Sequence, residues 1–302
     1  MRAVEDAVIL AGGKGTRMLP SSLYMPKETM PLVDTPILNH LIWEAARAGV
    51  KRVHLVLSQR KLEILDPFLS DVSIHDNEVR PDLPIHALSL GVPGVQIIPH
   101  LQDSANGVAD AVKQALSDIN GPFLVILGDM LILQKHLPPN SSGPKTASTA
   151  SKKLVERYNE NGLPCLGLFP VELREVVNYG IANLDRNMVV EIEEKPLESQ
   201  AASNLALCGR YLLPEETGDI LEKYPLSKYG DLQSIYLLRH FIEYGGLNGV
   251  VYNSPSSMYD SGNPLVWLKS QIDHALQRED FKGNLSSWLS EKLEKMGEES
   301  YH

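Results

Sequence analysis

The chain has 302 residues, of which 43% are apolar and 22% are charged, proportions that are ordinary for a globular protein with a substantial core. Its formal net charge of −10 argues against non-specific binding to nucleic acid and against anionic membrane surfaces, which repel an acidic protein. No signal peptide and no apolar stretch long enough to cross a bilayer is seen, and Cys165 and Cys208 are far apart in apolar surroundings, so we expect a cytoplasmic protein with two buried free thiols rather than a disulfide.

The N-terminal half alternates short apolar runs with amphipathic segments. The apolar runs predict strands at residues 7–11, 53–57, 95–99 and 123–127. Apolar residues at helical spacing predict one helix that begins near Pro36 and ends near Gly49, and a second over residues 106–119. Strand, helix and strand in succession imply parallel pairing with a right-handed crossover. The nearly all-apolar run at 123–127 is typical of a strand that is buried on both faces.

The C-terminal half is predicted to be less regular. Residues 137–150 are rich in Pro, Ser, Gly, Lys and Thr and indicate a surface loop or lid. Further along, the patterns predict a hairpin of residues 179–184 and 188–193, strands at 204–213 and 250–252, and helices at 215–223, 232–244 and 264–302. The last helical segment should turn Leu265, Leu268 and Ile272 to one face. We divide the chain into an α/β domain, 1–270, and a helical tail, 271–302, that packs on it or forms an oligomer interface.

A glycine-rich turn follows the first predicted strand. Gly12, Gly13 and Gly15 let backbone N–H groups approach a phosphate closely, because no β-carbon stands in the way. Arg17 and Lys27 then supply fixed positive charge. The segment matches neither a Walker loop nor the dinucleotide fingerprint. We interpret it as a phosphate-binding loop, and the alternative is a tight turn without a ligand.

Two acidic residues stand in positions that suit a metal ion. Asp129 comes directly after the buried strand at 123–127, at the end of the strand where α/β folds place ligands. Asp260 lies in a distant polar segment. Mg²⁺ is usually held by one or two carboxylates together with substrate phosphates and waters, which fits such a pair. The alternative for each aspartate is a helix or turn cap.

Polar residues at two further places suit a nucleobase and a sugar phosphate. Gln102 and Gly107 precede the second helix, and a glutamine amide donates and accepts at once, as the edge of a base requires. Glu194 and Lys195 close the hairpin, where they would meet sugar hydroxyls and a phosphate. The simpler interpretations are a polar loop and an exposed charged strand edge. Spacings typical of zinc sites and of serine hydrolases are absent from the sequence.

Five blocks between residues 6 and 276 occur in the order found in the sugar-1-phosphate nucleotidylyltransferases. The blocks are Gly15-Thr16-Arg17 with Pro26-Lys27-Glu28, Gln102 with Gly107 and Ala109, Leu127-Gly128-Asp129, Tyr179-Gly180 with Glu194-Lys195-Pro196, and Tyr259-Asp260-Ser261-Gly262. The chain most resembles the bacterial-type UTP–glucose-1-phosphate uridylyltransferases of this family. The resemblance implies an α/β, Rossmann-like nucleotide-diphospho-sugar transferase fold, with a mixed, mainly parallel sheet flanked by helices and a helical C-terminal tail.

The same resemblance implies a reaction and a set of partners. UTP and glucose 1-phosphate would give UDP-glucose and pyrophosphate, with Mg²⁺ as cofactor, in a homodimer or homotetramer. It implies that Ala11, Gly12, Gly13 and Gly15 bind the nucleotide, Arg17 and Lys27 its phosphates, Gln102 and Gly107 the uracil, Asp129 and Asp260 the Mg²⁺, Gly180 and Glu194 the hexose, and Lys195 the sugar phosphate. Arg17, Lys27 and Lys195 are the expected catalytic cations.

The sequence departs from the family at three places. Ser22-Leu23-Tyr24 stands where the uridylyl branch usually has Thr-Lys-Ala, and Met130 stands where many relatives have an acidic or polar residue. Ser234-Ile235-Tyr236 replaces the Leu-Thr-Asp of the family. Three alternatives therefore stay open: the same chemistry with another nucleotide or sugar, for example a thymidylyl- or guanylyltransferase; a non-catalytic regulator that binds nucleotide sugars; and a metal-dependent glycosyltransferase. The last is disfavoured because Gly128-Asp129-Met130 is not an Asp-x-Asp motif.

Overall fold

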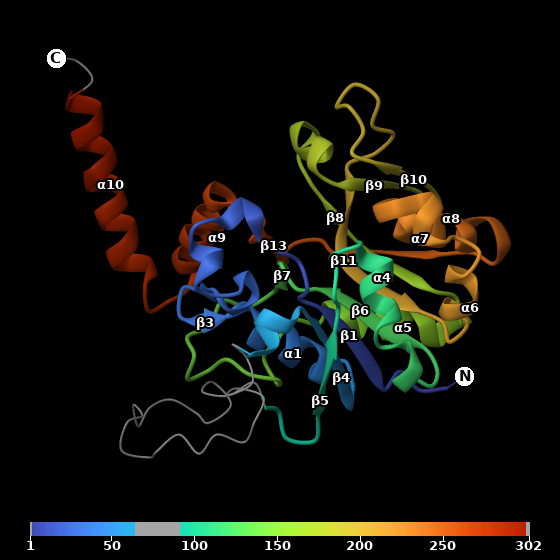
Figure 1. Ribbon diagram of the computed structural model, residues 1–302. Coiled ribbons are helices and arrows are strands. Elements are labelled where there is room, and N and C mark those ends of the chain that lie inside the picture. The colour runs from blue at the N-terminus through green and yellow to red at the C-terminus, as the bar shows by residue number, and fades with distance from the viewer. Residues whose placement is uncertain (1, 64–90, 300–302) are drawn as a thin grey trace.

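The computed structural model describes residues 2–63 and 91–299 (Figure 1). Within these residues a nine-stranded sheet with the order β5-β4-β1-β6-β11-β8-β12-β10-β9 forms the centre of the molecule. Its strands are β1 (Asp6–Leu10), β4 (Arg52–Leu57), β5 (Gln96–Leu101), β6 (Phe123–Leu127), β8 (Cys165–Pro170), β9 (Gly180–Asp185), β10 (Met188–Glu194), β11 (Leu205–Leu213) and β12 (Asn248–Val251).

Two small antiparallel sheets and a set of helices complete the described chain. The small sheets are β2 (Pro31–Leu32) with β3 (Thr35–Pro36), and β7 (Met130–Leu133) with β13 (Ser257–Asp260). The helices are α1 (Ile37–Arg47), α4 (Val108–Lys113), α5 (Ala150–Asn161), α6 (Thr217–Leu221), α7 (Leu226–Tyr229), α8 (Gln233–Tyr244), α9 (Pro264–Gln277) and α10 (Lys282–Glu299). Short 3₁₀ turns lie at Thr16–Met18, Ser21–Leu23, Lys27–Thr29, Leu116–Asp118, Leu173–Asn178 and Gly230–Leu232.

The mixed sheet is confirmed, and its two parts differ in direction. β5, β4, β1 and β6 run parallel to one another, as the strand–helix–strand pattern predicts. β11 then pairs antiparallel with β6 on one side and with β8 on the other. The chain reaches β11 from the β9–β10 hairpin and not through a crossover helix, so it enters the sheet in the opposite direction. Antiparallel pairing is therefore more extensive than the sequence suggests.

Each face of the sheet is covered by helices, and each has its own core. Along β1, Ala7 and Ile9 belong to one cluster, whereas Val8 belongs to the other, because successive side chains of a strand point to opposite faces. The first cluster includes residues of α1 and α5, and the second includes residues of α4, α6 and α8. The ends of the central strands are thereby held between two packed layers.

Several predicted elements agree with the structure, and others were missed. The strand at 123–127 and the hairpin around 185–187 are confirmed. The helix predicted at 106–119 is shorter, because α4 ends at Lys113 and only a 3₁₀ turn follows. α5 and β8 were not predicted, since a short apolar run such as β8 does not distinguish strand from helix. Cys165 and Cys208 are free and buried, as expected. Across the residues that the structure covers, none of the helices has the length and apolar character needed to cross a membrane.

The C-terminal region is helical, as predicted, but its buried face is different. Leu265 and Leu268 of α9 are 62% and 56% exposed, whereas Trp267 and His274 are buried. Asn263 accepts a hydrogen bond from Val266 N–H and so caps the start of α9, which packs against β13. α10 extends away from the body and contacts α9 (Figure 1). The expected domain boundary at residue 270 falls inside α9, and the division into domain and tail stays a proposal.

Candidate active site

The glycine-rich loop lies at the carboxyl end of β1, as predicted. Ala11 is buried and donates its N–H to Val56 O at 2.9 Å, which fixes the start of the loop. A β-carbon on Gly12 would lie 2.6 Å from Oε1 of Gln102, so the glutamine side chain packs on the bare backbone. A β-carbon on Gly13 would meet no atom within 4 Å, which leaves this part of the loop open. Gly15 adopts φ +66° and begins the turn that carries Arg17.

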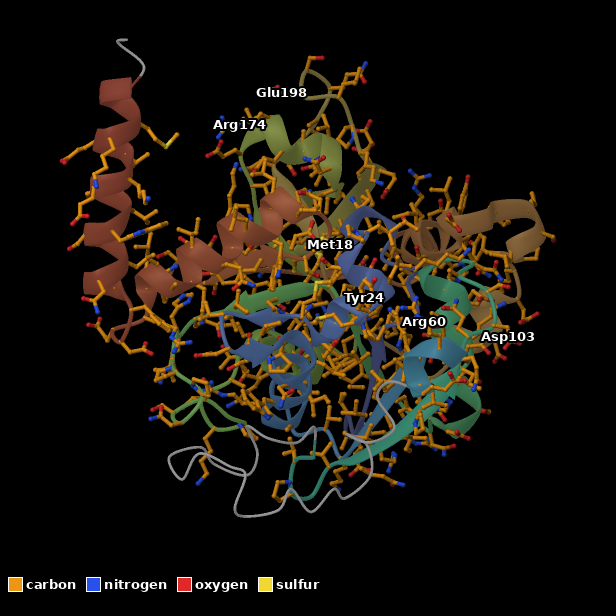
Figure 2. All side chains as sticks on the ribbon, turned by 60° about the vertical axis from the view of Figure 1, so that its left-hand side comes forward. Met18, Tyr24, Arg60, Asp103, Arg174 and Glu198 are labelled. Atoms are coloured by element: carbon orange, nitrogen blue, oxygen red, sulfur yellow. The ribbon has the colours of Figure 1, made fainter. Side chains whose placement is uncertain are left out.

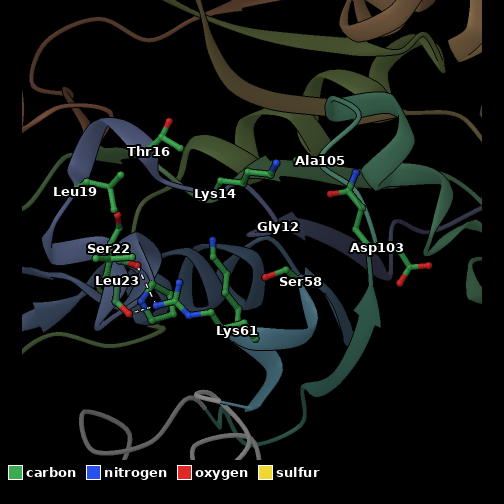
Figure 3. A pocket seen from close by; sticks show the side chains of 13 residues that line it. Gly12, Lys14, Thr16, Leu19, Ser22, Leu23, Ser58, Lys61, Asp103 and Ala105 are labelled. Carbon is green, nitrogen blue, oxygen red and sulfur yellow. Dashed lines mark hydrogen bonds between the residues drawn. The ribbon is translucent and has the colours of Figure 1, made fainter.

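A pocket of about 360 Å³ adjoins this loop (Figure 3). Leu19, Ser22 and Leu23 line one side, Asp103 and Ala105 line the other, and Ser58 and Lys61 lie between them. The remaining lining residues are Gly12, Lys14, Thr16, Pro26, Arg60 and Gln102. Figure 2 shows Arg60 on the outer surface between Tyr24 and Asp103. Arg60 donates to the carbonyl oxygens of Ser22 and Leu23, and so ties the departing segment at 22–24 to the end of β4.

Gln102 lines this pocket, and Gly107 lies further along the same loop, outside the pocket lining. Gln102 follows β5 and is buried, and its Nε2 donates to Oδ2 of Asp110 at 2.8 Å. Gly107 precedes α4 with φ +99°, and a β-carbon there would lie 3.2 Å from Cα of Asp231. The loop between β5 and α4 thus presents the Gln102 amide to the space beside Gly12, whereas Gly107 faces Asp231. This arrangement suits the edge of a nucleobase.

The two predicted metal ligands are brought together by a sheet that the sequence did not predict. β7 and β13 pair antiparallel with Met130 opposite Asp260, so Asp129 lies opposite Ser261. Ser261 N–H donates to Asp129 O at 2.9 Å and completes the junction. A residue at 129 and a residue at 260 therefore become neighbours although 130 positions separate them. The geometry supports the predicted pair of carboxylates.

Two cations face this pair of carboxylates. Lys27 Nζ lies 2.5 Å from Oδ2 of Asp129. The side chains of Arg17 and Asp260 both lie against Gly262. A β-carbon on Gly262 would be 2.7 Å from Oδ1 of Asp260 and 3.2 Å from Nη2 of Arg17, so the two side chains are neighbours. Burial, and then the charge of Asp129, raises the pKa of Asp260, while the Gly262 N–H, Arg17 and Lys27 oppose that rise. Arg17, Lys27, Asp129 and Asp260 thus form one charged cluster.

A buried ion pair beneath the loop was missed by the sequence reasoning. Lys61 Nζ donates to Oε1 and Oε2 of Glu28 at 3.0 and 2.8 Å, and to Ala11 O at 2.5 Å. Both side chains are buried, and burial is the largest cause both of the raised pKa of Glu28 and of the lowered pKa of Lys61. The pair connects the residue after Lys27 to the start of the glycine-rich loop. Nothing in the sequence around Lys61 distinguishes it from a surface lysine.

A second buried ion pair supports the strand that follows Asp129. Arg210 of β11 donates from Nε to Oε1 of Glu44 at 2.8 Å, and from Nη2 to Met130 O at 2.9 Å. Ser151 also donates to Glu44 from its hydroxyl, at 2.5 Å. Arg210 and Glu44 are fully buried, so their charges are balanced within the core. A charged residue inside the apolar pattern of a helix or strand is the signal by which each could have been found.

The sugar-side residues lie at the open end of the β9–β10 hairpin. Gly180 pairs with Glu194, and a β-carbon on Gly180 would lie 3.0 Å from Oε2 of Glu194. Lys195 follows with φ +48°, a conformation that is rare for a residue with a side chain, and its N–H donates to Tyr179 O at 3.0 Å. Such strained residues cluster at functional sites, which supports the predicted role of Lys195. A second pocket, of about 370 Å³, is lined in part by Tyr179 and Asp260.

Fold and site together define an α/β protein with a glycine-rich loop and a cluster of charged side chains at the end of a parallel strand. The family model described as "Nucleotidyl transferase" matches residues 6–245, and the chain belongs to this family. It is 29% identical over 298 residues to the UTP–glucose-1-phosphate uridylyltransferase 2 of Staphylococcus saprophyticus, covering 96% of this chain and 98% of that protein. It is 28% identical over 302 residues to the UTP–glucose-1-phosphate uridylyltransferase of Staphylococcus epidermidis, covering 96% and 99%.

Solved structures share the fold. A UDP-glucose pyrophosphorylase from Acinetobacter baumannii matches with a TM-score of 0.79 and 24% identity, over 95% of this chain and 99% of the other. A UTP-bound structure of the A. baumannii enzyme matches with a TM-score of 0.77, 24% identity and the same coverage. A UDP-glucose pyrophosphorylase in complex with UDP-glucose has a TM-score of 0.74 and 24% identity, over 90% of this chain and 98% of the other. The predicted family and fold class are thereby confirmed.

Proposed function

We propose that this chain transfers the uridylyl group of UTP to glucose 1-phosphate and releases pyrophosphate. The relatives and structures described above, which are named for this reaction or hold its UTP or UDP-glucose, support the choice of substrates. The observation that carries the proposal is the cluster in which Arg17 and Lys27 face Asp129 and Asp260 beside the glycine-rich loop. This cluster can hold phosphates at a point where two substrates would meet.

The chemistry requires positioning and charge neutralisation above all. An oxygen of the sugar phosphate attacks the α-phosphorus of UTP, the bond from that phosphorus to the bridging oxygen breaks, and pyrophosphate leaves. The attacking oxygen is already anionic near neutral pH, so no strong general base is needed. Arg17 and Lys27 would bind the triphosphate, and Lys195 would bind the sugar phosphate, which overcomes the repulsion between the two anions.

The predicted binding roles divide between the two sides of the site. Ala11, Gly12, Gly13 and Gly15 would contact the nucleotide, while Gln102 and Gly107 would contact uracil. On the opposite side Gly180 and Glu194 would contact the hexose. The open space at Gly13 and the packing of Gln102 on Gly12 support the first assignment. The approach of Glu194 Oε2 to Gly180 supports the second.

Asp129 and Asp260 fit a Mg²⁺ ion. Both offer hard oxygen ligands, and the raised pKa of Asp260 reflects a buried carboxylate facing a second one, an arrangement that a cation stabilises. Among the residues described, no group of three or more His, Cys, Asp or Glu side chains is arranged to hold a metal, which accords with two carboxylates and substrate oxygens as ligands. When bound, the ion would supply positive charge to the phosphates.

Pyrophosphate release tests the proposal. The purified protein is assayed with Mg²⁺ across UTP, dTTP, GTP, ATP and CTP against a panel of sugar 1-phosphates, with a chelator as control. Strong release with UTP and glucose 1-phosphate, lost on chelation, is the expected result. Pyrophosphate release with a different nucleotide or sugar 1-phosphate would support the same reaction with other substrates. Binding of a nucleotide sugar without any pyrophosphate release would instead support a non-catalytic regulator.

We also propose a cytoplasmic homo-oligomer, dimer or tetramer. α10 extends from the body, and its apolar side chains Trp288, Leu293 and Met296 are more than half exposed. On α9, Leu265 and Leu268 are also more than half exposed. Exposed apolar side chains on a projecting helix are typical of a surface that another protomer covers. Light scattering at micromolar concentration is expected to give a multiple of the 33.4 kDa chain mass, and a monomer mass would contradict this.

A further inference from the structure

We propose that Asp110 is a positioning residue that fixes the amide of Gln102 in one orientation and thereby sets the preference for uracil over cytosine. The inference rests on the proposed function, because it assumes that the space beside Gly12 and Gln102 holds the base. It concerns a residue to which neither the sequence motifs nor the family resemblance assigns a role.

The contacts of Gln102 leave its amide little freedom. The side chain is buried, and the backbone N–H donates to Leu57 O at 2.8 Å, so the residue is anchored to the end of β4. Nε2 donates to Oδ2 of Asp110 at 2.8 Å, and Oε1 lies against Gly12. Asp110 itself stands in the first turn of α4, three residues after Gly107. The amide is therefore held between the glycine-rich loop and the start of α4.

The chemistry of a carboxylate decides which way the amide faces. An ionised carboxylate only accepts hydrogen bonds, so Gln102 must direct its NH₂ group to Asp110. Its carbonyl oxygen then faces Gly12 and the pocket. An acceptor in that place suits N3–H of uracil or thymine, which donates. It opposes N3 of cytosine, which is an acceptor, so two lone pairs would face each other.

The isosteric change Asp110→Asn removes this constraint. An asparagine amide can either accept or donate, so the Gln102 amide can bond to it in either orientation. In the reversed orientation Gln102 presents NH₂ to the pocket, where it can donate to N3 of cytosine. The variant keeps the size of residue 110 and a hydrogen bond to Gln102, and changes the direction that the bond imposes.

The experiment compares nucleotides in the wild type and in Asp110→Asn. kcat and KM are measured for UTP, dTTP and CTP with saturating sugar 1-phosphate, and Kd for UTP and CTP is measured by calorimetry. We expect the ratio of kcat/KM for UTP to that for CTP to fall about tenfold, the value of one hydrogen bond, mainly through a higher KM for UTP. The ratio of UTP to dTTP should not change, because both bases present the same edge. Asp118→Asn, an exposed carboxylate one turn beyond α4, is the control and should leave all ratios unchanged.

Two outcomes would overturn the role of Asp110. One is an unchanged ratio of UTP to CTP, and the other is an equal loss for all three nucleotides, which would mark a purely structural residue. Absence of turnover by the wild type would overturn the proposed function instead. In that case the ratio of the two Kd values, which needs no turnover, still decides whether Asp110 controls the choice of base.

Discussion

The two sides of the proposed active site differ in how firmly their side chains are held before substrates arrive. On the nucleotide side, the Lys27 side chain is 13% exposed and bonded to Asp129, and Gln102 is buried and bonded to Asp110. On the sugar side, the Lys195 side chain is 59% exposed and pairs with its neighbour Glu194 at 3.7 Å. An ion pair of this kind at the surface contributes little to order.

This difference has a consequence for binding. Side chains that are already fixed lose little conformational freedom when a ligand arrives, whereas exposed lysine and glutamate chains must be ordered at that moment. On the proposed assignment, the nucleotide side is ready to bind UTP without rearrangement, and the sugar side would gain its final order when the sugar phosphate binds. Changes on the first side should affect rate and stability, and changes on the second should affect mainly the KM for the sugar phosphate.

The change with the largest expected effect is Asp129→Asn. It keeps the shape of the side chain but removes a charge that holds Lys27 and, on our proposal, Mg²⁺. We expect kcat for pyrophosphate release to fall roughly a hundred- to a thousandfold, as for the loss of one transition-state charge contact. Asp185→Asn, at the exposed tip of the β9–β10 hairpin, is the control and should be nearly as active as the wild type. Near-normal turnover by Asp129→Asn would remove this residue from the reaction.

The buried pair under the glycine-rich loop gives the next largest effect, on stability. Glu28→Gln leaves Lys61 buried without a counter-ion, and we expect the free energy of unfolding to fall by about 3 kcal/mol in urea titration. KM for UTP should rise, because Ala11 shares the same lysine, while KM for the sugar phosphate should not change. Glu5→Gln breaks the exposed pair with Lys51 and should cost less than about 1 kcal/mol. Equal effects of the two changes would show that the nucleotide side is not held by its buried charges.

Buried histidines near the β7–β13 sheet have lowered pKa values, which predicts sensitivity to acid. Burial, and then Arg278 and His136, lowers the pKa of His40 to about 4. His274 is lowered to about 3, chiefly by burial, although Asp280 opposes the shift. His136 and His274 lie against Tyr259 of β13, at ring-centroid distances of 6.1 and 6.2 Å, next to Asp260.

The sign of the pH dependence follows from the direction of these shifts. The folded pKa of His40 lies below the unfolded value of 6.5, so the unfolded chain binds the extra proton between pH 6.5 and about 4. The contribution of His40 to the free energy of unfolding is fully present above the unfolded pKa and is lost as the pH falls toward the folded pKa. From pH 7 to pH 5 it should cost about 2 kcal/mol of unfolding free energy. Between pH 7 and pH 5 the free energy of unfolding, measured by urea titration, should fall less in His40→Leu than in the wild type. An identical fall in the two proteins would contradict the prediction.

The sequence predicts the nucleotide side well because its elements are local. The strand at 123–127, the glycine-rich loop and the parallel order all follow from short patterns whose meaning does not depend on distant residues. The β7–β13 pairing was not predicted, because it joins segments that are distant in the sequence and because the apolar run of β7 follows that of β6 after only Gly128 and Asp129. Lys61 was missed for the same reason, since its burial depends on where Glu28 folds. Leu265 and Leu268 were expected to share one face of the C-terminal helix, but both are exposed in the structure. Apolar spacing does not show whether a helix face is covered by this chain or by another.

The change with the smallest expected effect, Lys195→Ala, tests the sugar side and its contrast with the nucleotide side. Lys195→Ala removes an exposed cation from the open end of the hairpin, and its backbone would have to keep the left-handed conformation that the structure gives it. We expect KM for glucose 1-phosphate to rise about tenfold, the value of one hydrogen bond to a charged group, with KM for UTP unchanged. Lys152→Ala, in a surface pair on α5, is the matched control and should leave both constants unchanged. If Lys195→Ala raised KM for UTP as strongly as for the sugar phosphate, the two sides would not act separately. The contrast between a fixed nucleotide side and a sugar side ordered by its ligand would then fail.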